Sequence, residues 1–169
     1  RTMIKLMANF DDPKVEKKED LVNYLEEYEV KSNYTYALKD AQEFNDVLNE
    51  IQVLPNFLFF SKEGTLLNPE NKTQCISDVE NFLKTLDSLN IEDPVEANKF
   101  NLNYVTSRMV DLDGNPVTLK ENNFYMVGFW AKFMGKNCIN KVKAYVDEAE
   151  KREDITIVLL TFDPQEFWE

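Results

Sequence analysis

The sequence predicts a three-layer α/β fold, in which helices flank a mixed central sheet. Three observations predict it. Strand-like and helix-like segments alternate along most of the chain, two strand-like segments are apolar almost throughout, and two tight turns join neighbouring strands as hairpins. Continuous apolar runs are typical of central strands buried on both faces, whereas hairpins add antiparallel pairs. The sheet is therefore expected to be mixed.

The first ninety residues contain six predicted segments of regular structure. These are a buried strand at 2–10, a helix at 13–30 opened by Asp12 and Pro13, a strand at 34–38, a helix capped by Asp40, a hairpin at 53–67 and a helix at 76–89. Helical spacing predicts that the following side chains face the core: Val15, Leu21, Val22, Leu25 and Tyr28 in the first helix, Phe44, Val47, Leu48 and Ile51 in the second, and Ile76, Val79, Phe82, Leu83 and Leu86 in the third.

The remaining segments follow a connector at 91–104. This stretch has no sustained hydrophobic periodicity, and it is long enough to include one helical turn. The segments after the connector are a hairpin at 109–119 around the turn DGNP, a buried strand at 122–130, a helix at 138–153 and a buried strand at 155–162. In the last helix, Ile139, Val142 and either Tyr145 or Val146 are expected to face inward.

The composition excludes several kinds of partner. The chain has 169 residues, of which 43% are hydrophobic, enough for one domain with a packed core. Its 31 acidic and 19 basic residues give a net charge of -12, which repels phosphate backbones and anionic lipid surfaces. No stretch approaches the roughly 18 apolar residues of a membrane span. We therefore expect neither a nucleic-acid partner nor a membrane span in this chain.

The available side chains also limit the chemistry. The sequence contains no histidine and two cysteines, Cys75 and Cys138. Ser-His and Cys-His nucleophiles are therefore excluded within this chain, and two cysteines cannot build a disulfide framework. The segment DLDGN at 111–115 begins like a calcium loop, but Asn122 stands where the closing glutamate is required. We expect no metal and no cofactor.

Three segments resemble parts of the thioredoxin-like superfamily. Residues 124–150, FYMVGFWAKFMGKNCINKVKAYVDEAE, resemble the strand, turn and helix that carry the W-C-x-x-C redox motif. Residues 51–67, IQVLPNFLFFSKEGTLL, resemble the later segment in which a cis-proline precedes a strand and the last edge strand. Residues 111–119, DLDGNPVTL, resemble the hairpin found in the branch of exported thiol-disulfide oxidoreductases and peroxiredoxin-like proteins. This resemblance implies a thioredoxin-like fold and favours a periplasmic or other extracytoplasmic location.

The order of these segments is reversed relative to that family. Residues 1–90 resemble a second half with the cis-proline motif, and residues 105–169 resemble a first half with a degenerate redox motif. The segments MIKLMANFDDP at 3–13 and ITIVLLTFDP at 155–164 both resemble the strand that follows the redox helix. The chain is either a piece of a tandem protein or a circular permutant. Because one sheet has room for a single such strand, exchange of strands or halves between two chains is expected, giving a homo-oligomer.

The redox motif itself is degenerate. Matching Trp130 and Gly135 to the family pattern W-A-x-W-C-G-P-C places Phe133 at its second aromatic position. The two redox cysteines then correspond to Met134 and Asn137. Two-thiol exchange, in which one thiolate attacks and a neighbour resolves, is therefore not available to this chain.

Cys138 lies one residue beyond the second redox position, and two interpretations stay open. At the start of a helix beside lysines its thiolate is favoured, which would make it a single catalytic nucleophile. An isolated cysteine is more commonly an inert, buried apolar side chain. The same alternatives apply to Cys75.

The resemblance also implies a peptide-binding groove. In the family, the cis-proline and the residue before it line a groove for an extended peptide, and here these residues are Leu54 and Pro55. If the two halves assemble, they face Trp130, Phe133 and Met134. This set could bind a peptide without redox chemistry, or it could simply cover the core.

Three functions are compatible with these observations. The first, which we favour, is a redox-inactive thioredoxin-like module that acts as a scaffold or binds a peptide or protein. The second is a single-cysteine thiol oxidoreductase or peroxidase-type enzyme that uses Cys138. The third is a piece of a longer protein whose other domains carry the chemistry.

Overall fold

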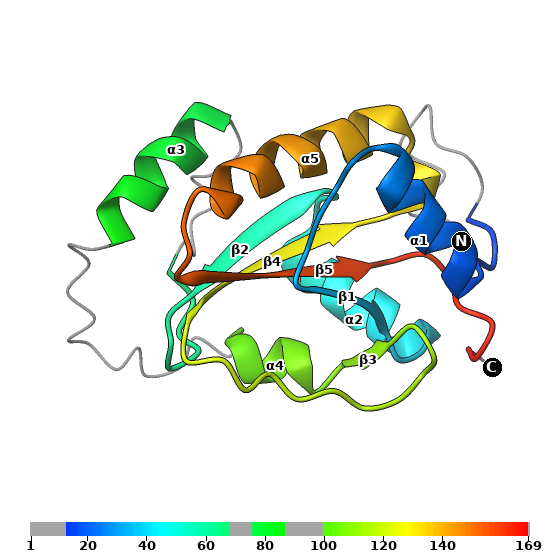
Figure 1. Ribbon diagram of the computed structural model, residues 1–169. Helices are drawn as coiled ribbons and strands as arrows, with labels where there is room; N and C mark the ends of the chain where they lie inside the picture. Colours follow the sequence, from blue (N-terminus) through cyan, green and yellow to red (C-terminus); the bar gives the residue numbers. More distant parts are fainter. Residues whose placement is uncertain (1–12, 68–75, 87–99, 169) are drawn as a thin grey trace.

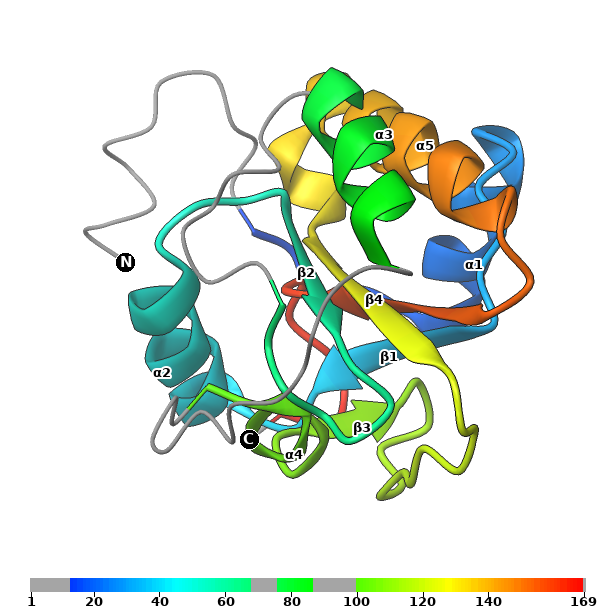
Figure 2. The ribbon, with the colours of Figure 1, turned by 90° about the vertical axis from the view of Figure 1, so that its left-hand side faces the viewer.

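The computed structural model describes residues 13–67, 76–86 and 100–168, which form a five-stranded mixed sheet with helices on both faces (Figure 1). The elements, in chain order, are α1 (Lys18–Glu27), β1 (Tyr34–Leu38), α2 (Ala41–Ile51), β2 (Asn56–Phe60), α3 (Ile76–Thr85), α4 (Leu102–Thr106), β3 (Met109–Asp111), β4 (Phe124–Trp130), the 3₁₀ helix η3 (Lys132–Met134), α5 (Lys136–Glu150) and β5 (Ile155–Thr161). Helices α1, α3 and α5 cover one face, and α2 and α4 lie on the other (Figures 1 and 2). The expected α/β architecture with a mixed sheet is confirmed.

The strand order in the sheet is β2-β4-β5-β1-β3. The three inner strands are parallel, since β5 pairs in parallel with both β4 and β1. The outer strands β2 and β3 are antiparallel to their neighbours β4 and β1. The carboxyl ends of β4 and β5 therefore lie at the same edge of the sheet, and the segments that follow them are brought together there.

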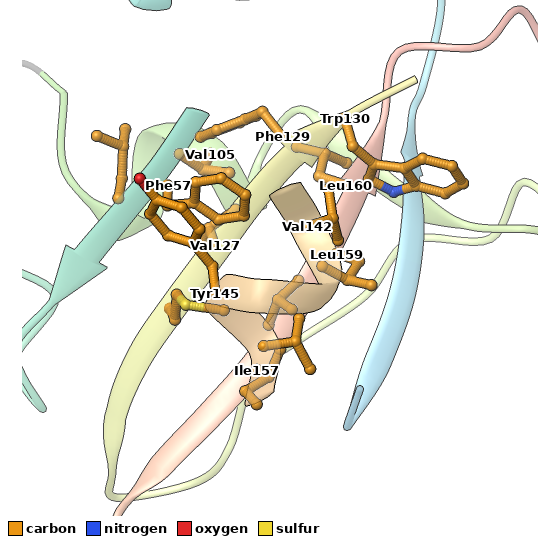
Figure 3. Close-up of a cluster of buried hydrophobic side chains, with 14 of the residues drawn as sticks. Phe57, Val105, Val127, Phe129, Trp130, Val142, Tyr145, Ile157, Leu159 and Leu160 are labelled. Carbon is orange, nitrogen blue, oxygen red and sulfur yellow. The ribbon is translucent and has the colours of Figure 1, made fainter. Parts of the chain in front are cut away.

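Of the three inner strands, β4 and β5 are buried along almost their whole length, as their apolar sequences predict. Helix α5 packs over them and contributes Val142 and Tyr145 to the cluster drawn in Figure 3. The ring of Tyr145 stacks on Phe57 of β2, with centroids 3.9 Å apart and an interplanar angle of 16°. This contact joins α5 to the strand that follows Pro55.

Residues 1–90 and residues 105–169 both contribute strands to a single sheet. Strands β1 and β2 come from residues 1–90, and β3, β4 and β5 from residues 105–169. The backbone N–H of Glu16 donates to the carbonyl of Pro164 over 2.8 Å, so the segment that leads into α1 runs beside the segment that leaves β5. The residues just before α1 therefore lie beside the residues just after β5. Residues 2–10, the expected N-terminal strand, lie outside the described residues.

Several element boundaries differ from the prediction. Helix α1 begins at Lys18, five residues after Pro13, because Glu16 forms a strand-like bridge with Gln165. Val15 is consequently 62% exposed, and its expected inward position is wrong. The second arm of each predicted hairpin is a single bridge, Phe60 with Leu66 and Val110 with Pro116. In both cases, the described residues after the turn pair with the first strand at one position only.

The remaining predicted elements agree more closely. Asp40 caps α2 by accepting a hydrogen bond from the Glu43 N–H at 2.9 Å. Helix α5 occupies Lys136–Glu150, so it begins two residues before the predicted start and ends three residues before the predicted end. Both Tyr145 and Val146 are buried. The connector at 91–104 is described only from residue 100 onward. The helical turn expected in this connector is α4, which ends at Thr106 and so extends beyond residue 104, the predicted end of the connector.

Candidate functional site

The candidate site is the turn between β4 and α5, residues 131–135, which we call the motif turn. Strand β4 ends at Trp130, η3 follows immediately, and Gly135 separates it from α5. Gly135 has φ of +79°, a backbone conformation that glycine adopts without the steric cost of a side chain. The glycine therefore allows the chain to turn from the strand directly into a helix.

A buried carboxylate holds the motif turn in place. Asp163, just after β5, accepts hydrogen bonds from the backbone N–H groups of Lys132 at 2.7 Å and Phe133 at 3.2 Å. The Thr161 hydroxyl donates to the same carboxylate at 2.6 Å. Burial raises the pKa of Asp163 to about 6 from an ordinary value of 3.8, although these three hydrogen bonds favour the charged form. The turn is thus fixed by a residue from the neighbouring strand.

The three site residues from β4 and the motif turn are mostly buried. Trp130 is fully buried and its ring is parallel to that of Tyr24 in α1, with centroids 6.1 Å apart; Figure 3 shows Trp130 at the end of β4. Its indole N–H has no hydrogen-bond acceptor within the described residues. Phe133 is 6% exposed and Met134 8% exposed. Met134 is therefore a packed apolar side chain.

The other two predicted groove residues lie at the same end of the sheet. The Leu54–Pro55 peptide bond is cis, as the family resemblance implies. Both residues are half-buried, and the next residue, Asn56, pairs with Phe129 of β4. Pro55 therefore lies near the point at which β4 leaves the sheet for the motif turn.

Cys138 lies in the first turn of α5 and is 3% exposed. Burial is the main cause that raises the pKa of its thiol to about 11, and the nearby Asp163 carboxylate acts in the same direction. Lys141 and the Ala131 backbone act in the opposite direction without compensating for burial. The thiol is thus protonated near neutral pH. Cys75 lies outside the described residues.

A shallow pocket of about 280 Å³ opens beside the motif turn, between it and α1. We call it the lysine pocket, and it is lined by Lys14, Glu16, Tyr24, Tyr28, Lys132, Phe133, Gly135 and Lys136. Figure 1 shows the start of α5 beside α1. Of the five predicted groove residues, Phe133 alone lines this pocket. Leu54 and Pro55 directly precede β2, the edge strand that pairs with β4, and do not line the pocket, so the pocket is a different surface from the predicted groove.

The sequence reasoning missed Asp163 and the lysine pocket. A signal for Asp163 was present, since an acidic residue directly follows the long apolar run of β5. The carboxyl ends of parallel strands lie together, so this carboxylate had to lie near the end of β4. The pocket had no comparable signal, because its residues come from three separate segments.

Comparison with family models, with characterised proteins and with solved structures finds no match to this chain. None of the helices in the described part of the chain combines the length and apolarity needed to cross a bilayer. The described residues also contain no group of three or more acidic or cysteine side chains arranged to hold a metal ion.

Proposed function

We propose that the chain is a redox-inactive, thioredoxin-like module that serves as a scaffold or binds a peptide or protein. The observation that carries the proposal is the content of the two redox positions. Met134 packs as an apolar side chain and Asn137 carries an amide, so no pair of thiols exists at the start of α5. Thiol-disulfide exchange requires an attacking thiolate and a resolving thiol.

Two structural features support the thioredoxin-like part of the proposal. The segment with the cis peptide bond before Pro55 leads into β2, which pairs antiparallel with the strand that carries the degenerate motif. Strands from residues 34–60 and from residues 109–161 form one sheet, as two half-domains in reversed order would require.

The alternative enzyme, which uses Cys138 as its single nucleophile, has less support. A reactive cysteine requires an accessible thiol with a lowered pKa. Cys138 is buried and the pKa of its thiol is raised to about 11. Its position at a helix start does not compensate for this burial.

The direct test of the redox assignment is the reduction of insulin disulfides with dithiothreitol as the electron source. We expect the protein to add nothing to the background rate. A rate similar to that of an ordinary thioredoxin would contradict the proposal.

The peptide-binding part is tested at Phe133. Replacement of Phe133 by alanine should weaken the binding of an extended peptide, because buried aromatic contacts commonly contribute a large share of interface energy. Far-UV circular dichroism provides the control. If the variant unfolds, Phe133 belongs to the core and the groove loses its support.

A further inference from the structure

The lysine pocket carries positive charge on a strongly acidic protein. Three of its eight lining residues are lysines, whereas the chain as a whole has a net charge of -12. Lys132 forms an ion pair with Glu16 at 3.1 Å. Within the described residues, no carboxylate lies at ion-pair distance from Lys14 or Lys136, and both side chains are exposed. Two ammonium groups at the pocket thus have no carboxylate partner among the described residues.

The walls of the pocket are aromatic. Tyr24 and Tyr28 of α1 pack against each other with ring centroids 5.0 Å apart, and Phe133 lies on the side of the motif turn. The ammonium of Lys132 lies 5.7 Å from the centroid of the Tyr24 ring. Aromatic walls bind apolar groups, and the lysines beside them can pair with carboxylates. The pocket therefore suits a ligand with both kinds of group close together.

Two carboxylates among the described residues lie close to the pocket, and both already have partners. Glu16 is already paired with Lys132, and Asp163 lies beneath the motif turn with its carboxylate bound to backbone N–H groups and the Thr161 hydroxyl. Neither carboxylate is paired with Lys14 or Lys136. The charge at the rim of the pocket thus complements an acidic partner.

We propose that the lysine pocket binds an acidic peptide segment in which aspartate or glutamate flanks an aromatic or aliphatic side chain. This inference rests on the proposed peptide-binding function, places the binding surface at the lysine pocket and not at the groove beside Pro55, and names the class of peptide. The apolar side chain lies against Tyr24, Tyr28 and Phe133, and the flanking carboxylates pair with Lys14 and Lys136. A neutral peptide would gain the aromatic contacts without the ion pairs.

The test is an NMR titration of the ¹⁵N-labelled protein with the acetylated and amidated pentapeptide Glu-Asp-Phe-Asp-Glu. The neutral peptide Gln-Asn-Phe-Asn-Gln and inorganic phosphate serve as comparison ligands. We expect the acidic peptide to shift the amide signals of the motif turn and α1. Its affinity should fall when the salt concentration is raised from about 0.03 M to about 0.3 M, because rim charges are screened.

The variant Lys14→Gln/Lys136→Gln removes both available charges without touching the core. We expect it to bind the acidic peptide about tenfold more weakly, the effect of losing two exposed ion pairs. The matched control is Lys62→Gln/Lys120→Gln, which changes the net charge equally at exposed lysines that line a separate pocket. This control should keep the affinity of the parent protein.

Each other outcome overturns a definite part of the inference. Equal affinity for the acidic and neutral peptides, with loss of both on Phe133→Ala, would reject the acidic class and leave peptide binding intact. Equal losses in both lysine variants would show a general charge effect and reject the pocket. Binding of phosphate alone would mean an anion site without peptide recognition. Absence of binding by either peptide would reject this inference, whereas insulin reduction separately tests the redox assignment.

Discussion

The protonation of Asp163 should make the stability of the protein depend on pH in an unusual direction. An aspartate in an ion pair normally favours the folded state above its pKa. Asp163 is fully buried, and burial raises its pKa to about 6 from 3.8. The folded protein therefore retains this proton at pH values where the unfolded chain has released it. The contribution to the free energy of unfolding is largest below about pH 4 and is lost as the pH rises through 6.

The magnitude follows from the two pKa values. Each pH unit between them corresponds to about 1.4 kcal/mol, so the full effect is about 3 kcal/mol. Roughly 1.4 kcal/mol of it falls between pH 5 and pH 8, a range that lies above the sequence pI of about 4.5. This restricted range avoids the association expected when the net charge approaches zero.

The assay is urea unfolding of the parent protein and Asp163→Asn between pH 5 and pH 8. Asparagine keeps one oxygen acceptor but does not titrate, so the difference between the two proteins isolates Asp163 from the other acidic residues. We expect this difference to shrink by about 1.4 kcal/mol as the pH rises. The exposed Asp20→Asn provides the matched control. A constant difference, or one that grows toward pH 8, would refute the account of how Asp163 holds the motif turn.

Two further predictions concern Cys138 and the central strand. Iodoacetamide should label Cys138 slowly in the folded protein at pH 7.5 and rapidly in urea, because burial raises the pKa of the thiol to about 11. Mass spectrometry identifies the labelled cysteine. Fast labelling of Cys138 in the folded protein would support the alternative function as a single-cysteine enzyme. Deletion of residues 155–169 removes β5 from between β4 and β1, so cooperative urea unfolding should be lost. A folded monomer after this deletion would show that the duplicate segment 3–10 replaces β5 within one chain. Light scattering of the intact protein tests separately for the oligomer that strand exchange predicts.

The sequence alone was sufficient to predict the interior strands of the sheet and the helices that pack on it. The apolar runs of β4 and β5 have no polar face, and only a central position buries both of their sides. Helix α2 was equally well determined, because Asp40 marks its start and Phe44, Val47 and Ile51 form one apolar face.

Local patterns were less informative where tertiary contacts decide the structure. Pro13 is compatible with the first turn of a helix, yet the chain stays extended until Lys18 because Glu16 pairs with the segment after β5. The lysine pocket likewise depends on contact between α1, the residues before it and the motif turn. Helical periodicity carries no information about contacts between segments that are distant in the sequence.

The candidate site was predicted in part. The cis peptide bond before Pro55 and the burial of Cys138 agree with interpretations made from sequence. Asp163 was overlooked, since its role comes from the parallel pairing of β5 with β4 and not from any motif around it.

The central claim, that an intact thioredoxin-like site has lost its chemistry by substitution at two positions, is tested most directly by Met134→Cys/Asn137→Cys. The variant restores the family spacing at the start of α5, and the two single variants are the controls. We expect the double variant to form a reversible intramolecular disulfide, detected by mass spectrometry, and to reduce insulin with dithiothreitol, while both single variants and the parent protein remain inactive. A folded double variant that forms no disulfide and shows no activity would contradict the claim.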